Sequence, residues 1–259
     1  MDTASPRIAS LVPSITELLI ALGLREYLVA RTGFCIHPAD AVADVPKVGG
    51  TKDVNIAKLR RLAPTHVIVN VDENRRETVD ALREFVPRIV VTHPQGPQDN
   101  LVLLDQMREQ FGALPGVSAR CEALATELQL ALARCRGQHW PERRVLYLIW
   151  REPWMTVARD TYISRMLAEV GWQTWPELNG GDAGAARYPM LSGDEPWLGR
   201  IEHVLLSSEP YRFDAGHVPL ARQLCPQACV QLVDGELLSW YGPRAAAGLD
   251  YLRGLGSRV

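Results

Sequence analysis

Hydrophobic positions recur every three or four residues over residues 118–136, near the middle of the chain, and this spacing predicts an amphipathic α-helix. Pro115 and Gly116 precede the segment, Ser118 is a candidate N-cap, and Gly137 follows its last residue. With a rise of about 1.5 Å per residue the helix would extend roughly 30 Å, about the width of a small domain. We therefore expect one long helix that joins two parts of the chain.

Short apolar runs alternate with helical patterns on both sides of this helix. Such runs are typical of buried parallel strands, and their alternation with helices predicts an α/β fold. The expected strands are residues 7–12, 28–31, 65–71, 88–92, 144–150, 203–208 and 229–233. The expected helices are residues 14–23, 55–62, 75–85, 100–111, 161–170, 215–224 and 243–255, with a helical turn at 197–201. A capping box of Ser14 and Glu17 would open the first helix. Residues 32–54 lack a clear period, so we expect a long functional loop there.

One stretch of the sequence is repeated. The segment LRRLAPTHVIVNVDENRR at 59–76 is echoed by WLGRIEHVLLSSEPYRF at 197–213, each with a helical turn, an apolar strand and a loop that carries Glu and then Arg. We therefore expect two similar Rossmann-like α/β lobes joined by a single backbone helix, with a ligand cleft between them where strand ends face each other. The expected boundaries are 1–115 for the first lobe, 116–137 for the spanning helix and 138–259 for the second lobe.

Composition and charge limit the classes of partner that the chain is expected to bind. The net charge is −2 and no basic stripe alternates with aromatic residues, so we expect no nucleic-acid partner. No apolar segment is long enough to span a bilayer, and the first residues show no signal-peptide pattern. As given, the chain is expected to be cytoplasmic unless a leader was trimmed. Five cysteines at irregular spacings indicate reduced thiols rather than a disulfide framework.

Aromatic residues are the main candidates for ligand contact. Trp150, Trp154, Trp240 and Tyr241 occur at strand ends or in loops flanked by Gly or Pro, where binding residues are expected, and they offer flat apolar faces with polar tips. By contrast, three other tryptophans occur in helical or post-helical context, which favours a place in the core. These are Trp172, Trp175 and Trp197.

Charged residues are a second group of candidates. Lys52 and Arg244, ahead of Arg151 and Arg187, could meet a carboxylate or phosphate of a ligand. No nucleophile elbow, phosphate loop or paired-carboxylate motif is present, so we expect a binding protein rather than an enzyme, with no intrinsic cofactor and no bound metal. The alternative is a cytosolic enzyme or tetrapyrrole-handling factor on the same scaffold, because the same architecture hosts enzymes. Its test residues would be Cys35, His37 and His93.

Three segments resemble one known family along essentially the whole chain. They are the opening PRIASLVPSITELLIALG, the loop HPADAVADVPKVGGTKDVNIAKLRRLAPTHVIV and the closing DGELLSWYGPRAAAGLDYL. These segments are similar to the helical-backbone metal-chelate receptors, the class III periplasmic substrate-binding proteins of cobalamin, siderophore and haem ABC importers, and most similar to the cobalamin receptors. The resemblance implies two lobes joined by a single helix, a metal-chelate ligand held between them with little hinge motion, and a periplasmic location. We expect a monomer.

The resemblance also assigns residues to the cleft. The aromatic positions of the cobalamin receptors match Phe34, Trp150 and Tyr188, and the polar end of the cleft matches Glu236, Trp240 and Tyr241. Where those receptors carry cleft tryptophans on the first lobe, this chain has Thr51, next to Lys52, and Asn70. We expect the aromatic faces to cover a flat ring while Lys52, Glu236 and Arg244 orient its polar groups.

One departure concerns the importer. Receptors of this family dock on an ABC permease through one exposed glutamate on each lobe, and the position in the first lobe matches Ala57. In the second lobe, Asp194 or Glu195 could still serve. The sequence therefore leaves open a binding protein that does not feed an importer.

Overall fold

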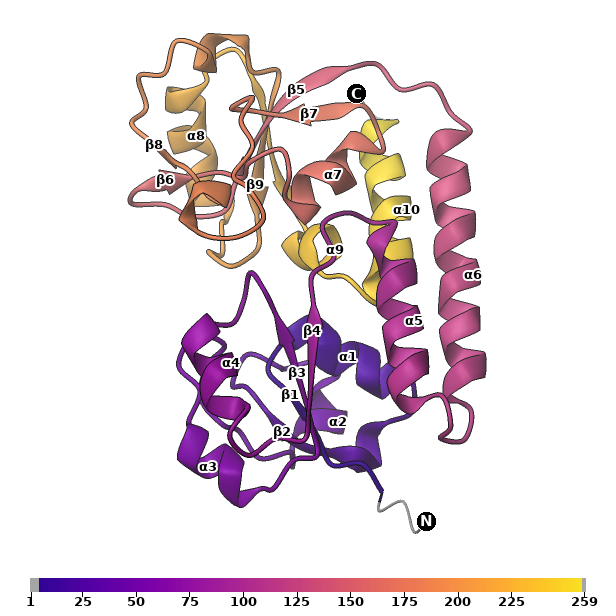
Figure 1. Cartoon of the computed structure of the whole chain (residues 1–259). Coiled ribbons are helices and arrows are strands. Elements are labelled where there is room, and N and C mark those ends of the chain that lie inside the picture. Colours follow the sequence, from indigo (N-terminus) through magenta and orange to yellow (C-terminus); the bar gives the residue numbers. More distant parts are fainter. Residues whose placement is uncertain (1–4, 258–259) are drawn as a thin grey trace. The chain divides into compact units, whose positions relative to one another are not determined.

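The computed structural model describes residues 5–257 and divides into two compact units (Figure 1). Unit 1 comprises the residues up to His93, Leu101–Ala125 and Tyr241–Pro243, and unit 2 comprises Pro94–Asn100, Thr126–Trp240 and the residues from Arg244 onward. The long helix α6 (Val117–Arg136) contributes its first turns to unit 1 and the rest to unit 2. The helix expected at 118–136 is therefore confirmed.

Unit 1 is built on a four-stranded parallel sheet with the order β2-β1-β3-β4. Its strands are β1 (Ile8–Ser10), β2 (Leu28–Arg31), β3 (His66–Asn70) and β4 (Arg88–Thr92). Its helices are α1 (Pro13–Ala21), η1 (Arg25–Tyr27), α2 (Ala39–Val42), α3 (Ile56–Arg61), α4 (Arg76–Leu82) and most of α5 (Asp99–Phe111). Apolar side chains of β1 and β3 pack with those of α3 and α4 into one core cluster, because central parallel strands bury both faces.

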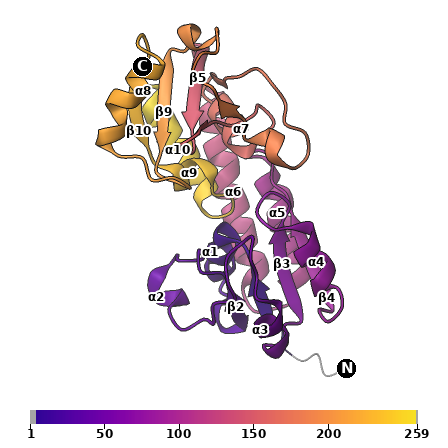
Figure 2. The same ribbon diagram turned by 90° about the vertical axis from the view of Figure 1, so that its left-hand side faces the viewer.

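Unit 2 repeats this topology. Its sheet has the order β10-β9-β5-β7. Read from β7, this is again the order second-first-third-fourth along the chain; Figure 2 labels β10, β9 and β5. Its strands are β5 (Arg143–Leu148), β7 (Trp172–Thr174), β9 (His203–Ser207) and β10 (Cys229–Val233), with a small antiparallel pair of β6 (Trp154–Met155) and β8 (Met190–Leu191). Its helices are α7 (Tyr162–Ala168), η2 (Ala185–Arg187), η3 (Leu198–Arg200), η4 (Ala215–His217), α8 (Val218–Leu224), α9 (Gly235–Ser239) and α10 (Arg244–Gly256). The expected α/β class, with one parallel sheet in each repeated half, is confirmed.

Several local expectations were wrong. Helix α6 begins at Val117, and the Ser118 hydroxyl donates to the Gly112 carbonyl rather than capping the helix. Helix α1 begins at Pro13, whose fixed φ suits a first helical position, and its N-cap residue Val12 makes no side-chain capping bond. The sequence also gave no indication of β7 or α9, because elements of three and five residues are too short to show a period.

Candidate functional site

The loop after β3 organises the candidate residues of unit 1. Asn70, at the end of the strand, accepts hydrogen bonds on its Oδ1 from the backbone of Asp72 (2.8 Å) and Glu73 (3.2 Å). The Asn74 amide donates to the carbonyls of Leu11 (3.2 Å) and Thr51 (2.9 Å). Asn70 is buried, so its amide shapes the loop at the carboxyl end of the sheet.

Other predicted residues of unit 1 gather around this loop. The Lys52 ammonium donates to the Asp72 carbonyl at 2.6 Å, and Thr51 is held through its carbonyl by Asn74. Phe34 lies against Gly50, since a Cβ built on that glycine would meet the Phe34 ring at 3.3 Å. The Phe34 side chain is 63% exposed, which leaves an aromatic face open to solvent.

Tyr241 belongs to unit 1 although it lies far along the chain. Its hydroxyl donates to the Glu73 carboxylate at 3.0 Å, across a sequence separation of 168 residues. Burial raises the pKa of the Tyr241 phenol well above its ordinary value, and the Glu73 charge raises it further. The phenol therefore stays protonated as a hydrogen-bond donor. Tyr241 is only 7% exposed, so its side chain supports the loop after β3 rather than presenting an aromatic face to a ligand.

In unit 2, aromatic rings pack around the end of β5. The Trp150 and Tyr211 rings meet edge to face with centroids 5.5 Å apart, and Trp154 stacks on Phe213 at 6.0 Å. The Arg151 guanidinium lies 5.1 Å above the Trp154 ring, in cation–π contact. Trp150 is 41% exposed, so it is a second aromatic face open to solvent at the carboxyl end of a parallel strand.

A polar cluster follows β9 and β10 in the same unit. The Arg244 guanidinium donates to the Glu236 carboxylate at 2.7 Å and lies 4.8 Å from the centre of the Trp240 ring. The Trp240 indole donates to Glu209 at 2.9 Å, and the Ser239 hydroxyl donates to the same oxygen. Burial raises the pKa of Glu209, which these two bonds oppose. Trp240 itself is buried, so Glu236 and Arg244 are the more accessible members.

The remaining candidates have mixed placements. Tyr188 is partly buried and precedes β8, whose partner strand β6 carries Trp154. Arg187 is fully buried and donates to the carbonyls of Gly181 and Asp160, so its role is structural rather than the ligand contact considered for it. Trp172 is buried, and Trp175 and Trp197 pack against the core of unit 2, as expected.

The residues named for the alternative function are partly accounted for by local contacts. Cys35 is buried, its thiol lies 3.1 Å from the Thr32 hydroxyl, and burial raises its pKa. His93 lies 3.7 Å from Asp72. Within residues 5–257, no group of three or more His, Cys, Asp or Glu side chains is placed to hold a metal ion. The arrangement offers exposed aromatic faces and fixed polar groups, which suit binding.

Comparison with known families decides the class. Residues 8–187 match the family described as periplasmic binding protein. This chain belongs to that family. Its vitamin B12-binding relative from Vibrio vulnificus (strain CMCP6) is 25% identical over 201 residues, which are 78% of this chain and 71% of the relative. The chain is thus similar to a periplasmic binding protein over most of its length.

Solved structures agree on the fold of this family member. The periplasmic vitamin B12 binding protein BtuF of Vibrio cholerae superposes with a TM-score of 0.76 at 20% identity, over 98% of both chains. The periplasmic haem binding protein HutB of Vibrio cholerae gives 0.78 at 20% identity, over 97% of this chain and 99% of the other. At this identity the likeness concerns the fold.

The positions expected to meet an importer can also be located. Ala57 is exposed in α3 and Asp194 is exposed, whereas the Glu195 carboxylate accepts bonds from the backbone of Ser192 (2.7 Å) and Gly193 (3.0 Å). The Glu195 carboxylate is therefore engaged in hydrogen bonds within the turn that contains it. Among the described helices, none combines the length and apolar character needed to cross a lipid bilayer.

Sequence reasoning missed several residues of both clusters. Tyr211 and Phe213 complete the aromatic group around Trp150, and Glu209 joins the polar group. A signal for them was present in the sequence: all three follow the buried strand β9, within the segment 197–213 that repeats residues 59–76. Carboxyl ends of parallel strands are where α/β sheets bind ligands.

Proposed function

We propose that this periplasmic binding protein family member captures a flat metal chelate of the cobalamin or haem type by non-covalent contacts from both units. The observation that carries the proposal is the pair of open aromatic faces, Phe34 and Trp150, each following a strand of a parallel sheet. Aromatic faces bind flat apolar rings well. The relatives named for vitamin B12 or haem binding support the same ligand class.

The chemistry of capture follows from these groups. Covering apolar ligand surface contributes about 25 cal/mol per Å², from which the cost of immobilising the ligand is subtracted. The ammonium of Lys52 and the Glu236–Arg244 pair then orient amide, carboxylate or phosphate groups at the edge of the ring. Ala57 offers no charge for docking on a permease, so the proposal is limited to capture.

Titration of the purified chain with cobalamin, haem and a ferric siderophore tests this proposal. We expect saturable quenching of tryptophan fluorescence by at least one of them, with no chemical change in the ligand. Trp150→Ala should raise the dissociation constant by about tenfold or more, because the lost indole face removes more than a kcal/mol of apolar contact. Lys52→Ala should raise it less, since an exposed charge contributes little.

Leu130→Ala provides the matched control, because Leu130 is an exposed apolar residue on α6 and lies outside both clusters. Its dissociation constant should equal that of the parent chain. An unchanged dissociation constant in Trp150→Ala would contradict the assignment of Trp150. Absence of saturable binding for all three ligands would contradict the ligand class.

A further inference from the structure

Arg151 lies in the turn between β5 and β6, and the described part of the chain does not use its hydrogen-bond donors. Its side chain is 25% exposed, and its Nε atom is buried without an acceptor. Within residues 5–257 its guanidinium contacts the Trp154 ring, at 5.1 Å, and the Glu152 carboxylate, at 3.3 Å. A guanidinium carries five N–H donors, and a buried donor without an acceptor is unfavourable. Arg151 therefore suits an acceptor that comes from outside the chain.

The two cationic residues that the sequence placed ahead of Arg151 are engaged more strongly. Arg244 donates to Glu236 at 2.7 Å, and neither of these side chains is more than 26% exposed. Lys52 donates to a backbone carbonyl at 2.6 Å. By contrast, the Glu152 side chain that pairs with Arg151 is 80% exposed, and water screens an ion pair with so exposed a partner. The contacts therefore place Arg151 first among these cations as a binding group.

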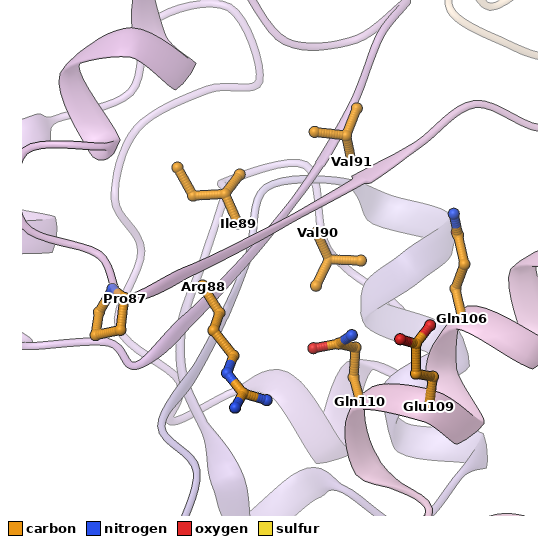
Figure 3. A pocket seen from close by; sticks show the side chains of 8 residues that line it. All are labelled: Pro87, Arg88, Ile89, Val90, Val91, Gln106, Glu109 and Gln110. Carbon is orange, nitrogen blue, oxygen red and sulfur yellow. The ribbon is translucent and has the colours of Figure 1, made fainter.

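Partial burial distinguishes Arg151 from an ordinary surface arginine. Arg88 lines a groove of about 480 Å³ between β4 and α5 (Figure 3), but it is exposed, so water can satisfy its donors. The Arg151 guanidinium has lost part of its hydration, while its Nη2 atom still reaches the exposed Glu152 carboxylate at the surface. An anion that meets a partly desolvated cation is bound more strongly than one that meets a hydrated cation.

The same turn carries the open aromatic face of unit 2. Glu152 has a φ of 66°, in the left-handed region that favours glycine, and such strain is often kept at binding sites. Trp150 is 41% exposed, and two rings of the segment after β9 link it to Trp154, with successive centroids 5.5, 4.8 and 6.0 Å apart. The open indole and the Arg151 guanidinium therefore belong to one packed group.

We propose that Arg151 binds an anionic oxygen group, a carboxylate or a phosphate, at the edge of the flat ring that Trp150 covers. This inference rests on the proposed function and names the feature of the ring that the chain selects. The planar guanidinium can donate two parallel hydrogen bonds to such a group, and its contact with Trp154 holds its plane. Rings with an anionic group at their edge should therefore bind more tightly than neutral rings of the same shape.

Two pairs of ligands test the proposal and separate the two sources of charge. Gallium protoporphyrin carries carboxylates that its dimethyl ester lacks, and cyanocobalamin carries a phosphodiester that dicyanocobinamide lacks. Quenching of tryptophan fluorescence gives each dissociation constant for the parent chain and for Arg151→Gln. We expect this variant to raise the dissociation constant of the charged member of one pair by about tenfold to a hundredfold. The neutral member should change by less than about twofold, because it has no charge-assisted hydrogen bond to lose.

Two further variants separate binding from effects on the fold or on net charge. Arg88→Gln removes the same charge from the start of β4, at the end of the sheet opposite the carboxyl ends of its strands, and should leave every dissociation constant unchanged. Arg151→Lys keeps a cation near Trp154 but loses the planar fork, so it should raise the dissociation constant of the charged ligand less than Arg151→Gln does.

The possible failures can be told apart. Equal weakening of the charged and neutral members in Arg151→Gln would show that Arg151 only supports its turn, and would overturn the proposal. Equal dissociation constants for both members of each pair in the parent chain would overturn it too, while ring capture that is weakened in Trp150→Ala would still stand. Absence of binding by all four ligands would overturn the proposed function and this inference together.

Discussion

His203, the first residue of β9, makes the stability of unit 2 depend on pH. It is 6% exposed, and its ring stacks on Trp172 with centroids 5.7 Å apart and an interplanar angle of 6°. Burial lowers the pKa of His203, Arg143 lowers it further, and Glu202 partly opposes both. The imidazole therefore stays neutral in the folded chain over a pH range in which the unfolded chain binds a proton.

The sign of the effect follows from this difference. The unfolded histidine takes up a proton as the pH falls through about 6.5, while the folded one does not, so the free energy of unfolding decreases below that pH. His203→Phe keeps a flat ring against Trp172 and should flatten this decrease. Urea unfolding followed by tryptophan fluorescence measures it, because all seven tryptophans lie in unit 2. Leu130→Ala, at an exposed residue that does not titrate, should keep the parent slope, and equal slopes in all three proteins would contradict the assignment.

At the scale of single residues, some members of the candidate site could be predicted from the sequence and others could not. Trp150 was predicted as a ligand contact from its place at a strand end, and Phe34 from the family resemblance; both side chains present open faces. The hydrogen bond from Tyr241 to Glu73 could not be inferred, because no local pattern links residues 168 positions apart. The burial of Asn70 could not be inferred either, since it results from a turn in which the side chain replaces water as the acceptor for two backbone groups.

At the scale of elements, α10 packs on α9 so closely that one position requires glycine. A Cβ at Gly248 would lie 2.1 Å from the Leu237 carbonyl oxygen and 2.7 Å from the Met166 methyl group. In an isolated helix, alanine would be favoured over glycine by about 1 kcal/mol. Here the overlap with backbone outweighs that preference, and Gly248→Ala should destabilise unit 2 by about 1–3 kcal/mol.

A second glycine of α10 provides a control, because its replacement by alanine should change the stability in the opposite direction. A Cβ at Gly254 would meet no atom within 4 Å, and the residue is exposed in the last turns of α10. Gly254→Ala should therefore stabilise the chain by about 0.5–1 kcal/mol. Chemical unfolding of the two variants measures both effects, and a stabilising Gly248→Ala would show that α9 and α10 are free to separate.

The elements themselves were largely predictable. The bounds expected for β2, β4 and β10 are those observed, because each is an apolar run between turn residues. The helix expected at 215–224 is divided into η4 and α8, since Asp214 and His217 form a capping box that closes the short first turn. Helix α9, which carries Glu236, was missed because Asp234 caps only a single turn and a half.

At the scale of the whole chain, the repeated segment was the most informative feature. It predicted two similar α/β halves, and the two sheets indeed share one strand order. The expected boundaries at residues 115 and 138 and the cleft between the lobes stay predictions. Sequence periodicity reports which face of an element is apolar, whereas the placement of one folded unit against another depends on side chains distant in sequence.

The proposal that both units contact the ligand predicts a linked stabilisation of both. A ligand that binds only the folded chain adds about 2.7 kcal/mol at a hundredfold excess over its dissociation constant. Tryptophan fluorescence reports unit 2, and labelling of Cys121, a thiol of α6 that is 2% exposed, reports opening of unit 1. Saturating ligand should raise the unfolding midpoint of unit 2 and slow the labelling of Cys121, while the exposed Cys229 labels at an unchanged rate. If only the tryptophan transition shifts, the ligand is held by unit 2 alone, and Phe34, Thr51 and Lys52 are not part of its site.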